Sequence, residues 1–187
     1  SVRDRLKNSA TNGNEMRFIY DASDRLIAVE DDLGKLHRFT YDGSGRLTRL
    51  KDATSREWVY QYDAAGRLSS VTTPAIATGE AQFPSGLKSE YAYSAPSGSL
   101  AGQLAQRDNL ISVKDAKGQV PAEWTYTDAD ADGQAEEVTA QKWGGKPLSI
   151  VYDFDAGAAA RTATVTDRRS NVWAYGHDGE GRLVRAE

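Results

Sequence analysis

A seven-residue word that recurs at a fixed interval constrains the fold of this chain more than any other feature. The word reads Tyr-Asp, two variable residues and then Gly-Arg-Leu, and its copies begin at Tyr20, Tyr41 and Tyr62, 21 residues apart. A fourth copy begins at His177, with His in the Tyr position, and in the first copy Asp24 replaces Gly. A fixed period of this length is typical of repeat architectures, in which each unit packs against its neighbours in sequence.

Each copy of the word contains the residues of a tight turn. Its Asp favours a type I turn by capping the backbone, and its Gly accepts the positive φ that lets two strands continue as a hairpin. These turn residues are Asp21, Asp42, Gly45, Asp63, Gly66, Asp178 and Gly181. A second turn signal lies halfway through the period, in the segments that begin at Asp31, Asp52, Asp115 and Asp167.

The turn markers predict an all-β fold, an antiparallel β-meander. From Asp21 to Asp63 they follow one another every 10 or 11 residues. Removing a turn of four leaves about six or seven residues, close to the usual length of a strand. Between turns the side chains alternate, because Trp58, Tyr60 and Tyr62 fall on one face of a strand. Successive aromatic residues of this kind would form a ladder across neighbouring strands.

The strand that follows each word fits this alternation less well. Leu47 and Leu50 are three residues apart, as are Leu68 and Val71, so strict alternation would place the members of each pair on opposite faces. Either a β-bulge inserts one extra residue, or both faces of the sheet are partly covered. The residue pattern leaves both alternatives open.

The period also divides the chain into segments. Residues 1–15 form a lead-in, and residues 16–73 contain three regular repeats. Residues 74–90 break the period and are expected to be a loop or insertion, because Pro and Gly are frequent there. Residues 91–187 contain degenerate repeats that end in the regular copy at His177.

The four words resemble YD repeats, the units of the Rhs family, of the shell components of Tc insecticidal toxin complexes and of the teneurin shell. The consensus is met in full at Tyr41 and Tyr62. The resemblance implies a strongly twisted, curled β-ribbon that forms part of a β-shell. It also implies a non-catalytic structural segment of a secreted or cell-surface protein. Its partners would be the remaining repeats and the C-terminal toxin cargo of the same polypeptide. The Asp-Pro-x-Gly-Leu-like segment at which such shells cleave themselves is missing, so we expect a fragment of a larger protein.

Composition argues against several other classes. The chain has 23 Lys and Arg against 27 Asp and Glu, a formal net charge of −4, which disfavours nucleic acid as a partner. No apolar run is long enough for a membrane helix, so we expect no membrane insertion. There is no Cys to serve as a nucleophile and no Gly-x-Ser-x-Gly motif. We therefore expect no enzymatic activity. The alternative is a glycosidase or lyase that uses two paired carboxylates, but the spacing of the Asp and Glu residues does not single out such a pair.

One segment has the opening of a calcium-binding loop. Asp128, Asp130 and Asp132 occupy the first, third and fifth positions, and Glu136 the ninth. The twelfth position is Thr139, so the closing bidentate Glu is missing. The alternative is an enlarged turn within its repeat. No other cofactor is expected.

Aromatic and basic side chains suggest a rival function, a carbohydrate-binding module for cell-surface glycans. Trp rings stack on sugars, but they also cover sheet faces. The candidate residues are Trp58, Trp124, Trp143 and Trp173. The recurring Arg of the word could face an anionic glycan, or could pair with the turn Asp or lie over a Tyr ring. Exposed strand edges predict self-association between copies of the chain.

Overall fold

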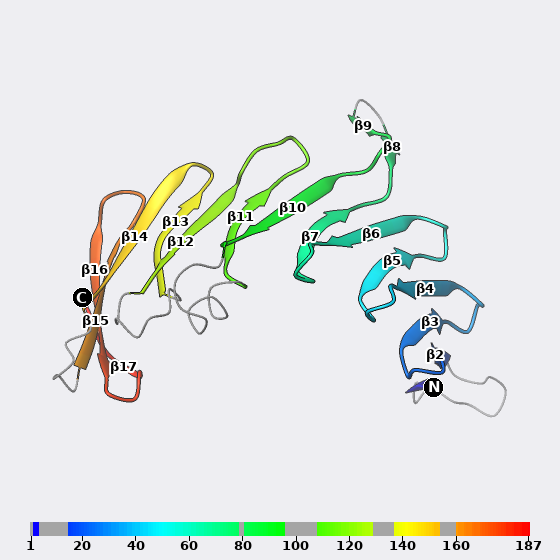
Figure 1. The fold of residues 1–187 in the computed structure, drawn as a ribbon, viewed down its shortest axis with the longest axis horizontal. Coiled ribbons are helices and arrows are strands. Elements are labelled where there is room, and N and C mark those ends of the chain that lie inside the picture. The colour runs from blue at the N-terminus through cyan, green and yellow to red at the C-terminus, as the bar shows by residue number, and fades with distance from the viewer. Residues whose placement is uncertain (1, 4–14, 79–80, 96–107, 129–136, 154–159) are drawn as a thin grey trace. The chain divides into compact units, whose positions relative to one another are not determined.

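The computed structural model describes residues 2–3, 15–78, 81–95, 108–128, 137–153 and 160–187. All the regular structure in these ranges is β-strand, and they contain no helix that is long and apolar enough to cross a membrane. Contacts within the chain divide it into unit 1 (Ser1–Lys88) and unit 2 (Ser89–Glu187) (Figure 1).

Unit 1 is an antiparallel meander in which each strand pairs with the next strand in sequence. Its strands are β1 (Val2–Arg3), β2 (Glu15–Tyr20), β3 (Leu26–Glu30), β4 (Leu36–Tyr41), β5 (Leu47–Lys51), β6 (Glu57–Tyr62) and β7 (Leu68–Thr72). The segment that was expected to be a loop or insertion carries a separate hairpin, made of β8 (Ile76–Thr78) and β9 (Ala81–Phe83).

Unit 2 repeats the same topology. Its strands are β10 (Lys88–Tyr93), which begins at the boundary, β11 (Leu110–Lys114), β12 (Ala122–Thr127), β13 (Glu137–Trp143), β14 (Lys146–Asp153), β15 (Ala160–Thr166), β16 (Val172–Asp178) and β17 (Leu183–Ala186). Each pairs with the next in antiparallel orientation. The predicted all-β antiparallel meander is therefore confirmed.

A β-bulge follows the Tyr-Asp turns that begin at Tyr20, Tyr41 and Tyr62 and explains the irregular spacing of the leucines. In the β4–β5 hairpin, Phe39 pairs with Leu50 and Tyr41 pairs with Leu47, so Thr48 is the extra residue. Leu47 and Leu50 consequently lie on the same face although they are three residues apart. The same register shift occurs in the β2–β3, β6–β7, β10–β11, β12–β13 and β16–β17 hairpins. Of the two alternatives left open by the sequence, the bulge is the one that the structure has.

The two faces of the sheet in unit 1 differ in chemistry. Directly paired residues share a face, so Phe39, Leu50 and Trp58 lie side by side on β4, β5 and β6. The opposite face carries charged side chains, including an ion pair of 3.0 Å between Arg49 Nη1 and Glu57 Oε2. The alternation of strand residues therefore produces one aromatic and aliphatic face and one polar face.

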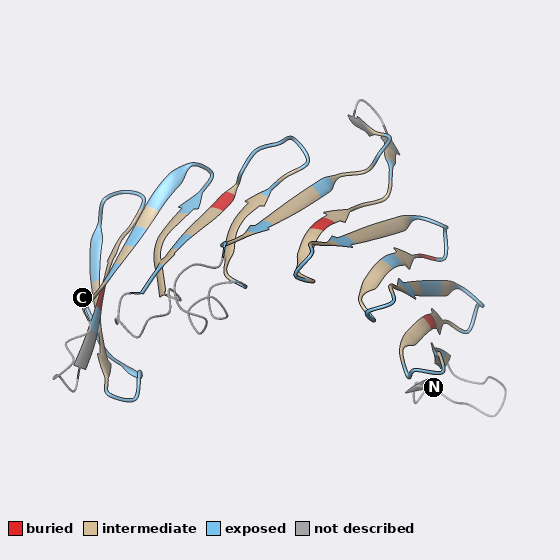
Figure 2. Ribbon diagram, viewed as in Figure 1, coloured by how far each residue is buried: buried red, intermediate tan, exposed pale blue. Residues whose placement is uncertain are grey.

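Few side chains are buried, because each unit is a single layer. Among the described residues, the buried apolar ones are Ala28, Ala122 and Ala163. Most of the remaining strand residues are half-buried, as the tan ribbon in Figure 2 shows. Within each unit, the contacts between described strands join strands that are next to each other in sequence. Stability therefore depends on contacts between neighbouring strands and within turns, as expected for a repeat protein.

Candidate functional site

The turns of the repeat share one backbone geometry. In the turn that begins at Asp42, the Asp42 N–H donates to the Arg46 carbonyl oxygen at 2.9 Å, and the Gly45 N–H donates to the Asp42 carbonyl oxygen at 3.0 Å. Gly45 has a φ of +79°, in the left-handed region where a Cβ is unfavourable. The first copy adopts the same conformation with Asp24, at a φ of +58°.

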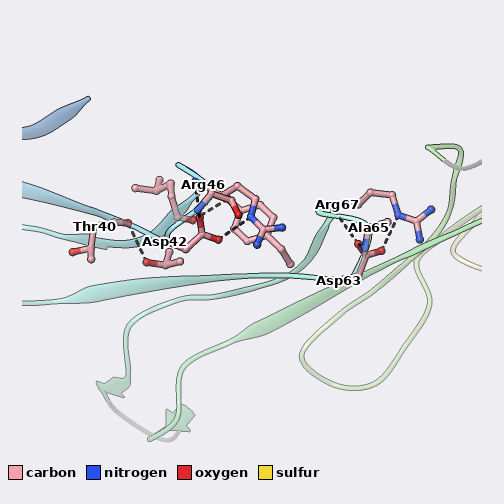
Figure 3. A network of polar contacts seen from close by, with 10 residues as sticks. Thr40, Asp42, Arg46, Asp63, Ala65 and Arg67 are labelled. Carbon is pink, nitrogen blue, oxygen red and sulfur yellow. Dashed lines mark hydrogen bonds and ion pairs between the residues drawn. The ribbon is translucent and has the colours of Figure 1, made fainter. Parts of the chain in front are cut away.

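The Asp side chain is the centre of each turn. Asp42 Oδ1 accepts hydrogen bonds from the backbone N–H groups of Ser44 and Arg46, both at 2.9 Å, and Asp42 Oδ2 accepts one from Arg46 Nε at 2.8 Å (Figure 3). The same three contacts form around Asp21, Asp63 and Asp178. The recurring Arg of the word thus pairs with the turn carboxylate.

The second kind of turn uses the same arrangement. Asp52 Oδ1 accepts from the N–H groups of Thr54 and Arg56, and its Oδ2 accepts from Arg56 Nε at 2.6 Å. The Thr54 hydroxyl adds a further bond to Asp52 Oδ1 at 2.7 Å. At Asp167, the Asn171 side-chain amide takes the place of the guanidinium. Both kinds of turn are therefore closed by a carboxylate that accepts several donors.

These donors stabilise the ionised carboxylate and change its acidity. The Arg46 backbone N–H is the main cause that lowers the pKa of Asp42; desolvation opposes it, and the Arg46 guanidinium adds to it. The corresponding Arg N–H lowers the pKa of Asp21, Asp63 and Asp178 in the same way. For Asp52, burial raises the pKa, but the donors from Thr54 and Arg56 together outweigh it, so that the pKa lies well below its ordinary value.

Consecutive copies of the word are joined by a Tyr. The Tyr62 hydroxyl donates to the Leu47 carbonyl oxygen at 2.8 Å, and the Arg46 guanidinium lies over the Tyr62 ring, 4.8 Å from its centroid. Tyr41 makes the same two contacts with the preceding copy, at 2.8 Å to the Leu26 carbonyl oxygen and 5.3 Å from Arg25. Each of these two Tyr residues thus donates a hydrogen bond to the Leu carbonyl of the preceding copy. Its ring also lies against the Arg guanidinium of that copy.

The position of the Leu carbonyl explains why a hydroxyl is needed. The β5–β6 ladder begins at the pair Arg49 and Val59, so Leu47 lies before its first pair. A half-buried carbonyl outside the ladder requires another donor. The Tyr62 hydroxyl supplies that donor, and burial of the phenol raises the pKa of Tyr62. The sequence contained the signal for this contact, a Tyr that follows the Leu of the first and second copies by 15 residues, but its meaning depended on the bulge.

The candidate carbohydrate-binding tryptophans lie on different strands. Trp58 lies on β6 in unit 1, opposite Leu50. In unit 2, Trp124 on β12 and Trp143 on β13 share a face as diagonal neighbours, since Trp124 pairs with Gln141 and Trp143 with Ala122. Trp173 on β16 pairs with Val165. Trp143 and Trp173 are 52% and 47% exposed.

The candidate calcium ligands fall largely beyond the described ranges. Asp128 ends one of these ranges, whereas Asp130, Asp132 and Glu136 lie outside them. Among the described residues, no group of three or more His, Cys, Asp or Glu side chains is arranged to hold a metal ion.

Comparison with known proteins assigns the repeat. The family model described as RHS Repeat matches residues 20–57 and 41–75. No curated protein matches the chain. The protein is therefore a repeat protein of the antiparallel β class. Its residues 20–75 match the model of the RHS repeat, as the Tyr-Asp words predicted.

Among solved structures, the chain is similar to large chains of toxin complexes. The Tc holotoxin pore of Photorhabdus luminescens is 16% identical, with 91% of this chain and 9% of that chain covered and a TM-score of 0.48. A TcdB2–TccC3 structure without its hypervariable C-terminal region is 11% identical, with 96% and 10% covered and a TM-score of 0.49. A second TcdB2–TccC3 structure is 16% identical, with 91% and 10% covered and a TM-score of 0.48. The chain thus spans about a tenth of the length of these chains.

Proposed function

We propose that this chain is a non-catalytic wall segment of a larger RHS-repeat polypeptide, where it forms part of a β-shell around a C-terminal toxin cargo. The observation that carries the proposal is the contact of each Tyr with the copy before it. Tyr62 holds both the guanidinium of Arg46 and the carbonyl of Leu47, and Tyr41 holds the copy before it in the same way, so the regular repeats of unit 1 brace one another. A wall needs this property, whereas an enzyme needs a pocket with converging reactive groups.

The chemistry of the turns supports the same role. The carboxylates of Asp21, Asp42 and Asp63 each accept three hydrogen bonds from donors of their own turn. Such groups are poor bases, because the donors lower the pKa of each carboxyl group. We propose a secreted or cell-surface location for the whole polypeptide, in keeping with the YD-repeat resemblance.

Limited proteolysis of the natural polypeptide that contains this chain tests the proposal. A double variant, Tyr41→Ala with Tyr62→Ala, removes two repeat-to-repeat contacts. We expect the segment that follows the repeats to be protected in the wild type and cleaved quickly in the double variant. Tyr20→Ala is the matched control, since Tyr20 is 56% exposed. Equal cleavage of the following segment in wild type and double variant would argue against enclosure.

The exposed aromatic face of unit 2 favours a second candidate function, the binding of cell-surface glycans. Trp143 and Trp173 are about half exposed, and Trp124 and Trp143 are diagonal neighbours on one face. Sugar rings bind to such exposed aromatic surfaces. A glycan array with the wild type, Trp143→Ala and Trp173→Ala tests this function. Loss of glycan binding in either variant would support this function. An array on which the wild type binds no glycan would refute it.

A further inference from the structure

A cavity opens in unit 1 where the regular repeat is interrupted. Its volume is about 270 Å³, and it lies between the strand β6 and the segment that follows β7. The residues that line it are Arg56, Trp58, Thr73, Pro74, Ala75, Ile76 and Leu87. All of them belong to one unit, so the walls of this cavity have a defined geometry.

The outer wall is held in place by a backbone clamp. The Thr73 N–H donates to the Leu87 carbonyl oxygen at 2.9 Å, and the Leu87 N–H donates to Thr73 Oγ1 at 2.9 Å. Gly86, with a φ of +76°, approaches so closely that a Cβ there would lie 1.9 Å from the Thr73 carbonyl oxygen. The clamp thus ties together Thr73 and Leu87, two residues of the cavity lining.

One cation, Arg56, lies at the cavity, and one of its five N–H donors is used within its own turn. Arg56 Nε donates to Asp52 Oδ2 at 2.6 Å, which holds the guanidinium, and the guanidinium lies 5.7 Å from the centroid of the Trp58 ring. Within the part of the chain that the structure describes, the two Nη atoms of Arg56 have no acceptor. A planar guanidinium fixed in this way presents two parallel donors, the geometry that a carboxylate accepts.

The rest of the lining selects an apolar ligand over a sugar. The side chains of Pro74, Ala75, Ile76 and Leu87 are hydrocarbon, and that of Trp58 is aromatic with one indole N–H donor. The hydroxyl group of Thr73 is already used, because it donates to the Pro74 carbonyl oxygen at 3.2 Å and accepts from the Leu87 N–H. Sugar hydroxyls against this apolar surface would lose their water and gain few partners in return.

We propose that this cavity is a binding site for a small organic anion, with an apolar ring against Trp58, Ile76 and Leu87 and a carboxylate on the Nη atoms of Arg56. A volume of about 270 Å³ is just below the range of drug-sized pockets, so it suits a single ring. The site goes beyond the wall function, since neither the turns nor the repeat contacts require it.

Phenylacetate is the probe for the test, because it combines one ring with one carboxylate. The signal is the Trp58 indole N–H resonance in two-dimensional NMR of the full chain, assigned by its absence in Trp58→Phe. We expect a saturable shift of this resonance with phenylacetate. The neutral analogue phenylacetamide should bind about tenfold more weakly, because it loses a charge-assisted hydrogen bond. Glucuronate, a sugar ring with a carboxylate, should bind more weakly than phenylacetate.

Arg56→Gln should weaken the binding of phenylacetate about tenfold, to the level of the amide. Arg182→Gln is the matched control, since Arg182 also donates Nε to a turn Asp but lies far along the sequence in unit 2. It should leave binding unchanged. Absence of a saturable shift at Trp58, equal affinity for phenylacetate and phenylacetamide, or an equal loss in both Arg variants would each overturn the proposal. Tighter binding of glucuronate would also overturn it and would assign the cavity to acidic sugars.

Discussion

Replacing Tyr62 by Phe removes one hydroxyl from the contact between two copies of the repeat. The ring remains, so the stacking of the Arg46 guanidinium on it is retained, and only the 2.8 Å bond to the Leu47 carbonyl oxygen is lost. An intramolecular hydrogen bond contributes about 0.5–1.5 kcal/mol, and an unsatisfied buried carbonyl costs about 1–3 kcal/mol. Leu47 is half-buried, so water reaches its carbonyl in part. We therefore expect unit 1 to lose about 1 kcal/mol of stability.

Hydrogen exchange measures this loss where it occurs. In a repeat protein, local opening of neighbouring strands governs exchange. The slowest amides of β5 and β6 should exchange about fivefold faster in Tyr62→Phe, the factor that corresponds to about 1 kcal/mol. Tyr20→Phe is the control, because the Tyr20 side chain is 56% exposed. Unchanged exchange in Tyr62→Phe, or equal acceleration in both variants, would refute the assignment of the Tyr62 hydroxyl as a tie between repeats.

Three further outcomes are expected. The pKa of Asp42 and of Asp52 in the folded state lies below the unfolded value of about 3.9. The ionised carboxylates therefore stabilise the folded state above that pH, and this contribution is lost as the pH falls through the folded-state pKa. The midpoint of urea unfolding should therefore be lower at pH 3 than at pH 7, and equal midpoints would contradict this. Gly45→Ala should lower the free energy of chemical unfolding by about 1–2 kcal/mol, because Gly45 has a φ of +79°. Gly43→Ala, in the same turn but without a positive φ, should lower it far less. Equal losses of stability in the two variants would contradict the turn geometry. Sedimentation of the 187-residue chain should show association that increases with protein concentration. The substitution Val184→Lys on the exposed strand β17 should weaken this association. A wild-type monomer at high concentration would contradict edge pairing.

The positions of turns and strands were predictable because the chemistry that sets them is local. Asp42 and Gly45 lie within one turn, and the carboxylate needs only donors two and four residues ahead. The same holds for the turn at Asp52, which lacks Gly and places Ser55 at a φ of +69° instead. Spacing alone therefore predicted the antiparallel meander and the length of its strands.

The hairpin of β8 and β9 shows where this reasoning ends. Its segment broke the period, and Pro and Gly indicated a loop or insertion. Within this segment the structure pairs Ile76 with Phe83 and clamps Thr73 against Leu87. Such pairing depends on residues 7 to 14 positions apart, for which the sequence has no regular spacing to reveal a partner.

The sequence by itself determined where the chain turns, which residues cap the turns and which strand faces are aromatic. The tertiary structure alone decided three things: the register that makes Thr48 a bulge, the bond from Tyr62 to Leu47, and the cavity beside Trp58. The physical reason is distance along the chain. Turn chemistry acts over about four residues, whereas these contacts form only after separate strands have paired and their side chains have met.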